Sequence, residues 1–496
     1  MKKQSFILLF GLTFLLLFNS CQNELSRRLD RLAVWQTTAL KLEKQQALLW
    51  WYYFTENRPM QLAESFALHP EFTSPDSIRF ARETLAMITE NKSQQAALRP
   101  LVRYLEQTYF RSRAAADYDR IRQLNDSKFV VPGIGEVQFS EIGRLLPTLN
   151  PAKQQAVLKA AYPNSVAMVA IRNHMRTELA DAAEQLGFID LNAAMDSLYF
   201  AGGTPDITPN RWIVQTQTAY DSLFRELFWN ENTQNFTATI EDLLQVIQHP
   251  GISGVLNAQQ MLSSGENLLR GLGIRLNRQS GLTVDTLENR NFSGKTVAIE
   301  IPSDIRMVVS PNAGLLSYVE YYQSLGSVES VLMNQEQNAI SRYIRNPWQQ
   351  SLSGIFEQLL QSPVWLAANF DSSEIATNQL RSTATFWAFW RSRSLAIALE
   401  LTEISDPNSQ IDNFANRLQT VMHFSADREA CAWLLALQPS FPELESGFYQ
   451  AILAPQMCRN LQQEFSVHWF ENIEAGKMLK DFWAKGSQLQ FSDLPH

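Results

Sequence analysis

The side chains best suited to metal-assisted hydrolysis are imidazoles, and their spacing in this chain does not favour a local metal site. The six histidines are His69, His174, His249, His423, His468 and His496. No two of them lie three to five residues apart, whereas a zinc-binding helix needs two imidazoles one turn apart on one face. Any histidine site would need ligands from distant segments. The chain also lacks a Gly-x-Ser-x-Gly motif and a phosphate-binding loop.

A series of landmarks precedes a short polar stretch in the second half of the chain. Residues 301–314 read Ile-Pro-Ser-Asp-Ile-Arg-Met-Val-Val-Ser-Pro-Asn-Ala-Gly, and residues 323–327 read Gln-Ser-Leu-Gly-Ser. This run resembles the heart of the oligopeptidase-type zinc metallopeptidases, the thimet oligopeptidase and oligoendopeptidase F group. The family carries His-Glu-x-Gly-His where this chain has 323–327. The resemblance therefore places two metal-ligand positions on Gln323 and Ser327, and the general-base position on Ser324.

A second segment locates the third ligand position independently. Residues 346–366 resemble the family's second helix, in which a ligand glutamate precedes Phe-Glu-x-Leu-Leu and a later Trp-Leu pair. Matching Phe356 and Glu357 to that segment puts Gln350 at the ligand position, and we expect Glu357 itself to be structural or solvated. Glutamine and serine are poor zinc ligands, and serine is no general base at neutral pH. We therefore expect a degenerate site that binds no zinc.

The resemblance extends roughly from residue 290 to residue 490. Near its end Tyr449 matches a family segment that contacts the reacting peptide, but Leu453 and Pro455 replace the tyrosine and arginine expected after it. Among the matching segments, those that border the family's substrate cleft carry four side chains that could orient an extended peptide: Asp304, Arg306, Tyr318 and Tyr449. The alternative for Asp304 and Arg306 is that they only brace a turn.

The N-terminus predicts an export signal. Two lysines precede an apolar run at residues 6–18, and Asn19-Ser20 precede Cys21. The run is short for a membrane span, and a small residue before a lone cysteine is typical of a lipoprotein signal. We expect removal of residues 1–20 and lipidation of Cys21, which would anchor the chain in a bacterial cell envelope, at the periplasmic or outer face of the outer membrane. The alternatives are an ordinary secretory signal and a short anchor.

The composition of the chain is typical of a globular protein. Hydrophobic residues make up 45% of the chain and charged residues 19%, which supplies a buried core. The 42 Lys and Arg against 50 Asp and Glu, without a basic cluster, argue against nucleic-acid binding. Cys431 and Cys458 are compatible with either a disulfide or two buried thiols.

The spacing of apolar residues is helical along almost the whole chain. Apolar spacing predicts helices over residues 30–54, 77–89, 93–113, 151–164, 173–186, 209–227 and 240–247, the sixth capped by Thr208. The Gly133-x-Gly135 pair predicts a turn. Apolar residues alternate at positions 297, 299 and 301 and again at 305, 307 and 309, which predicts two short strands. They form the only sheet we expect, near residues 295–310.

The fold class we expect is mostly α: a two-lobed metallopeptidase-like fold with a deep cleft. Residues 21–290 would form an N-terminal helical region and residues 291–496 a degenerate catalytic-like region.

Two functions follow. The first is a membrane-anchored, catalytically inactive peptidase relative that binds a peptide or protein partner in its cleft, without cofactor. The alternative is an active hydrolase with a relocated or non-standard site. Since removing one general base already costs on the order of 10²–10⁴ in rate, and the ligands are lost with it, the sequence favours the inactive protein.

Overall fold

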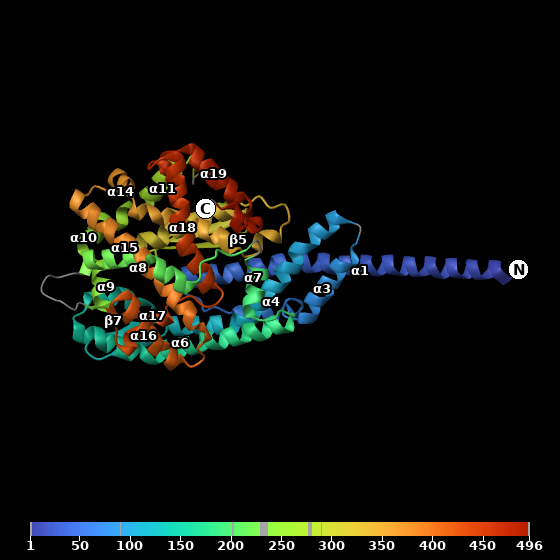
Figure 1. Ribbon diagram of the computed structural model, residues 1–496, viewed down its shortest axis with the longest axis horizontal. Helices are drawn as coiled ribbons and strands as arrows, with labels where there is room; N and C mark the ends of the chain where they lie inside the picture. Colours follow the sequence, from blue (N-terminus) through green and yellow to red (C-terminus); the bar gives the residue numbers. More distant parts are fainter. Residues whose placement is uncertain are drawn as a thin grey trace.

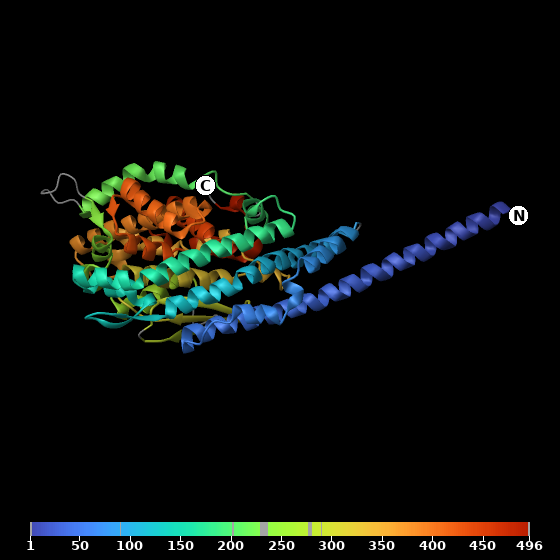
Figure 2. The same cartoon turned by 90° about the horizontal axis from the view of Figure 1, so that it is seen from below.

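The computed structural model describes residues 2–89, 91–200, 203–228, 237–275, 280–288 and 290–494, with side chains from residue 24 onward. Helices dominate this part of the chain (Figure 1), and the predicted fold class, mostly helical with a small sheet near residues 295–310, is confirmed. Helix α1 (Lys2–Glu56) projects at its N-terminal end away from the body (Figure 2). The predicted lipidation site, Cys21, lies outside the described side chains.

The first half of the chain is built mainly from helices of very different length. They are α2 (Leu62–Ala67), α3 (Pro75–Met87), α4 (Lys92–Asp126), α5 (Ile142–Leu145), α6 (Pro151–Gln185), α7 (Leu191–Leu198), α8 (Pro209–Phe228), α9 (Ile240–Ile247), α10 (Pro250–Val255) and α11 (Met261–Gly271). One prediction was wrong: residues 151–164 and 173–186 belong to a single helix, α6, which continues through Pro163. Packing of α6 against α4 and α17 (Arg428–Ala436) offsets the loss of stability from the backbone hydrogen bond that the proline cannot make.

The small sheet has three strands rather than two. The strands β5 (Gly294–Glu300) and β6 (Asp304–Val309) are antiparallel, as the alternation predicts, and β4 (Leu282–Thr286) joins β6 in parallel. Helix α12 (Leu315–Leu332) packs against β5 and β6. A separate apolar cluster of Trp51 from α1 with Val297, Ile299 and Val308 covers the sheet on its α1 side.

This sheet is not the only β-structure, contrary to the prediction. Strands β1 (Lys128–Val131) and β2 (Gly135–Gln138) form a hairpin, and β3 (Ala238–Thr239) pairs with β7 (Phe424–Ser425). The predicted turn is present between β1 and β2, where Gly133 and Gly135 have φ of 75° and 112°. These left-handed conformations favour glycine.

The second half continues in helices. They are α13 (Pro347–Ser353), α14 (Pro363–Asn369), α15 (Glu374–Glu400), α16 (Pro407–Met422), α17, α18 (Glu443–Phe465) and α19 (Ile473–Ala484). The helix expected over residues 346–366 is interrupted: α13 ends at Ser353, and a 3-10 turn over Phe356–Gln361 separates it from α14.

Segments from both halves of the chain share one core. Most buried apolar residues form a single cluster that runs from Leu32 to Leu494, in which α8 packs against α15 and α6 against α17. The division at residue 290 stays a prediction. Cys431 and Cys458 are free, buried thiols, and burial raises the pKa of each to about 12. Among the helices whose side chains are described, none is long and apolar enough to cross a membrane.

Candidate functional site

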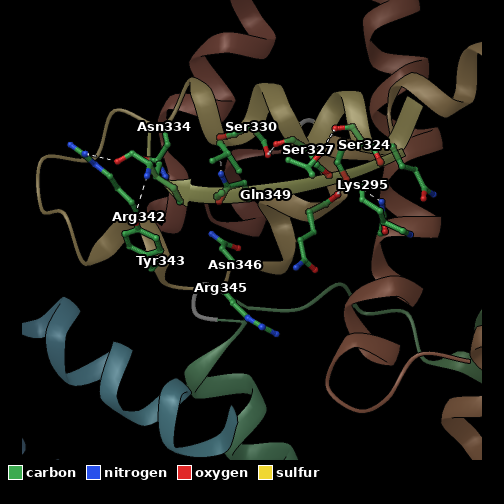
Figure 3. A pocket seen from close by; sticks show the side chains of 18 of the residues that line it. Lys295, Ser324, Ser327, Ser330, Asn334, Arg342, Tyr343, Arg345, Asn346 and Gln349 are labelled. Carbon is green, nitrogen blue, oxygen red and sulfur yellow. Dashed lines mark hydrogen bonds between the residues drawn. The ribbon is translucent and has the colours of Figure 1, made fainter. Parts of the chain in front are cut away.

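A polar cavity of about 550 Å³ lies where α12, α13, β5 and the loop at residues 342–346 meet. Figure 3 shows Ser324, Ser327 and Ser330 along one face of α12, with Gln349 and Asn346 opposite them. Gln323 and Gln350 also line the cavity. The structure thus brings together all four positions that the resemblance marks: the three ligand positions, Gln323, Ser327 and Gln350, and the general-base position, Ser324.

Two local features explain why these residues converge. On α12, Gln323 and Ser327 are four residues apart and therefore share one face of the helix. Gly326, between them, lets α13 approach closely, because a Cβ there would stand 2.5 Å from the carbonyl oxygen of Ser353. The Gln349 side chain then donates a hydrogen bond to the carbonyl of Ser330 at 2.9 Å, which ties α13 to α12. Helices α12 and α13 thus pack against each other.

A buried ion pair holds Gln323 at one end of the cavity. Glu357 is only 5% exposed, and its carboxylate accepts hydrogen bonds from both terminal nitrogens of Arg391, one of them at 3.0 Å. The side-chain amide of Gln323 donates to the same carboxylate, and Gln358 donates to it at 3.2 Å. Glu357 is therefore a structural residue, as expected, and its charge is neutralised inside the protein.

The carboxylates in the lining are already paired. Glu320 forms a salt bridge with Lys295. Glu43 accepts hydrogen bonds from Arg111 at 2.6 Å and from the Tyr104 hydroxyl at 2.8 Å. Both acids of the lining are therefore engaged in ion pairs.

One cation in the lining has no acid beside it. Arg345 pairs with Glu443 at 2.8 Å, but Arg342 donates only to two backbone carbonyls, Glu336 at 2.8 Å and Ile301 at 3.0 Å. Within the described residues Arg342 is the single charged side chain of the lining without a carboxylate partner. It leaves a positive charge at the end of the cavity where Tyr343 and Asn334 also lie (Figure 3).

The donor atoms of the cavity do not fit zinc. Gln323, Ser327 and Gln350 offer amide and hydroxyl groups, whereas zinc in proteins is held by imidazole, thiolate and carboxylate. In the part of the chain that the structure describes, no three histidine, cysteine, aspartate or glutamate side chains are grouped so that they could hold a metal ion. Ser324 is 8% exposed, and the carboxylate one helical turn before it, Glu320, forms a salt bridge with Lys295.

Asp304 and Arg306 lie away from this cavity. They form a two-point ion pair with each other at the start of β6, with both hydrogen bonds at 2.9 Å. The Arg306 guanidinium also stands 5.3 Å from the ring centre of Trp51, and a separate shallow hollow surrounds the three residues. This geometry matches the alternative in which Asp304 and Arg306 brace the turn before β6.

The two tyrosines are likewise outside the cavity lining. Tyr318 is fully buried and its hydroxyl donates to the backbone carbonyl of Asn257 at 2.7 Å. Tyr449 packs in the core against Phe200 and Trp348, and burial raises its pKa. The structure therefore does not gather Asp304, Arg306, Tyr318 and Tyr449 at the polar cavity, and their part in peptide binding stays a prediction.

Sequence reasoning missed a second, apolar chamber beside the first. It measures about 370 Å³ and shares Gln323 and Gln450 with the polar cavity. Three tryptophans line it: Trp387 and Trp390 on α15, and Trp433 on α17. The only signal in the sequence is the three-residue spacing of Trp387 and Trp390, which places both rings on one side of a helix.

Comparison with known proteins identifies the class of fold. No protein-family model matches the chain, and no curated protein matches it. Solved structures do match along almost the whole length. PZ peptidase A with an inhibitor gives a TM-score of 0.64 at 10% identity, covering 94% of this chain and 92% of that chain.

Two carboxypeptidases are similar to the same extent. Metallocarboxypeptidase 1 from Trypanosoma cruzi gives a TM-score of 0.59 at 11% identity, covering 94% of this chain and 95% of that one. The M32 carboxypeptidase from Deinococcus radiodurans R1 gives 0.58 at 10% identity, covering 94% of each chain. The chain therefore has a metallopeptidase-like fold. At such identities the likeness concerns the fold alone.

Proposed function

We propose that this protein is a catalytically inactive relative of the oligopeptidase-type metallopeptidases that binds a peptide, or an extended segment of a partner protein, without cleaving it. One observation carries the proposal: the four positions that would hold the metal and the base converge on one cavity, and they are Gln323, Ser324, Ser327 and Gln350. The place of the reaction is kept, but the reacting groups are replaced by neutral amides and hydroxyls.

The cavity suits the recognition of a polypeptide backbone. Glutamine and serine side chains both donate and accept hydrogen bonds, which matches the alternating N–H and C=O groups of an extended peptide. Arg342 adds one positive charge without a carboxylate partner among the described residues, which favours an acidic group or a terminal carboxylate of the ligand. The lining thus supports the binding and orientation of a peptide.

Metal analysis of the purified protein tests the inactive assignment. We expect less than stoichiometric zinc and no peptide hydrolysis that a chelator abolishes. Stoichiometric zinc, or chelator-sensitive hydrolysis that disappears when Gln323 or Gln350 is replaced, would overturn the proposal and support a non-standard active site.

Restoring the ligands tests whether the positions correspond to a metal site. Gln323→His and Ser327→His would put two imidazoles on one face of α12, and Gln350→Glu would add a carboxylate from α13. We expect the triple variant to bind one zinc per chain. The matched control carries Gln323→His and Gln350→Glu only, and it should bind zinc much more weakly. Failure of the correctly folded triple variant to bind zinc would show that these positions are not the former ligands.

We also propose that Cys21 carries the lipid that anchors the chain in a bacterial envelope. The support is the short apolar run that ends at this lone cysteine. Mass spectrometry of the native protein should find a lipidated Cys21 at the mature N-terminus, and Cys21→Ser should leave an unlipidated precursor. Cleavage at another position without lipid would contradict the anchor.

A further inference from the structure

We infer that the tryptophan chamber is the subsite that receives one large apolar side chain, aromatic by preference, of the peptide bound in the polar cavity. The tryptophan chamber is the 370 Å³ space lined by Trp387, Trp390 and Trp433 together with Leu243, Leu316 and Leu434. The inference rests on the proposed peptide-binding function and names the side chain that the site selects.

The size of the tryptophan chamber sets it apart from an ordinary packing gap. Protein interiors contain few voids larger than a water molecule, because each lost contact destabilises the fold. A space of about 370 Å³ falls within the range of small-molecule pockets, about 300–1,000 Å³. The tryptophan chamber is therefore large enough to receive one side chain of a ligand.

The walls of the tryptophan chamber favour a ring. Trp387 and Trp390 stack with ring centres 5.2 Å apart and planes 12° from parallel, which aligns two indole faces on α15. Aromatic rings in contact stabilise one another beyond the apolar area that they bury.

The charges around the tryptophan chamber argue against a charged occupant. The single charged residue in its lining is Arg391, and the buried carboxylate of Glu357 neutralises it. The other polar groups of the lining are neutral, among them Ser394 and Gln438. An ammonium or carboxylate placed here would lose its hydration without gaining a partner of opposite charge.

Two glutamines connect the tryptophan chamber to the polar cavity. Gln323 and Gln450 belong to both linings. The amide of Gln323 is held by Glu357, and that of Gln450 donates to the Ser353 hydroxyl at 3.3 Å. The two spaces are therefore adjacent, and a peptide in the polar cavity would place a side chain in the tryptophan chamber by displacing one of these two amides.

A peptide series on the native protein tests the inference directly. The probes are N-acetylated, C-amidated octapeptides of serine and glycine with one central Phe, Leu, Ala, Asp or Lys, and their dissociation constants are measured by calorimetry. We expect the Phe peptide to bind about 10- to 100-fold more tightly than the Ala peptide, given the apolar area a phenylalanine buries. The Asp and Lys peptides should bind no better than the Ala peptide.

Filling the tryptophan chamber should remove this preference. Gly447 on α18 lines it, and a Cβ there would have its nearest neighbours, the methyl groups of Leu395, at 3.9 Å. The Gly447→Met side chain therefore causes no clash with the backbone and occupies the tryptophan chamber. The affinity for the Phe peptide should then fall to the affinity for the Ala peptide. Gly254→Met is the matched control, because a Cβ added at Gly254 would meet no atom within 4 Å and this residue lines neither cavity. Trp387→Leu removes the stacked pair and should lower the affinity for the Phe peptide severalfold.

The outcomes separate this inference from the proposed function. Equal affinity across the series, or a Phe preference that survives in a folded Gly447→Met variant, overturns the subsite and leaves peptide binding intact. Absence of binding by every peptide overturns both proposals. A Phe preference that Gly447→Met abolishes and Gly254→Met preserves supports the subsite.

Discussion

Replacing Gly326 with alanine should destabilise the protein, although alanine is the better helix former. Gly326 lies inside α12 at its contact with α13, and an added Cβ would stand 2.5 Å from the carbonyl oxygen of Ser353 and 2.7 Å from its Cα. Real Cβ atoms essentially never approach closer than 3.0 Å. Both neighbours are backbone atoms, so no side-chain rotation can relieve the overlap and the two helices must separate.

Two opposing effects set the magnitude. Overpacking a tight contact costs about 1–3 kcal/mol, and a contact with backbone belongs at the upper end. Alanine in place of glycine in a helix interior returns roughly 0.5–1 kcal/mol. The expected net loss is about 2 kcal/mol. Since Gln323 and Gln350 lie on the two helices that meet at this contact, the polar cavity should widen as well.

Urea unfolding of the two matched variants checks this reasoning. Gly447→Ala makes the same substitution inside α18, where the nearest atoms are 3.9 Å from the added Cβ. It should move the unfolding midpoint to higher urea, whereas Gly326→Ala should move it to lower urea. If both variants shift in the same direction by similar amounts, α12 and α13 are not in the close contact described.

Two further predictions concern buried charge. Arg391→Met leaves the carboxylate of Glu357 buried without its partner and should lower the free energy of unfolding by about 3–5 kcal/mol. The double variant with Glu357→Met should recover most of this stability. A loss below about 1 kcal/mol in urea unfolding of Arg391→Met would contradict this. Burial, with a smaller contribution from Asp196, raises the pKa of Glu445 from 4.5 to about 7. The folded state therefore holds this proton more tightly, so stability falls as pH rises from about 4.5 to 7 and the loss is complete above pH 7. Glu445→Gln should be more stable than the native protein at about pH 8, by at most about 3 kcal/mol. Near pH 4 the two proteins should be equally stable. An equal difference in stability at both pH values would refute the raised pKa of Glu445.

Local patterns in the sequence were enough for the helical character of the chain and for the β5–β6 strand pair. The spacing of apolar residues reports the helical and extended periods directly, because side chains repeat every 3.6 residues on a helix and every two on a strand. It predicted α9 to the residue and the β5–β6 pair. The four-residue spacing of Gln323 and Ser327 likewise placed both on one face of α12 before any tertiary contact was known.

Contacts between distant segments needed the tertiary structure. Parallel pairing of β4 with β6, the continuation of α6 through Pro163 and the burial of Tyr318 depend on what each element packs against. The same holds for the tryptophan chamber, whose walls come from α15, α17 and other elements far apart in the chain. A periodic pattern tells which face of an element is apolar, but the partner of that face is decided by the packing of the whole chain. For this reason the sequence determined which residues stand at the positions that the resemblance marks, and only the fold decided which side chains surround them.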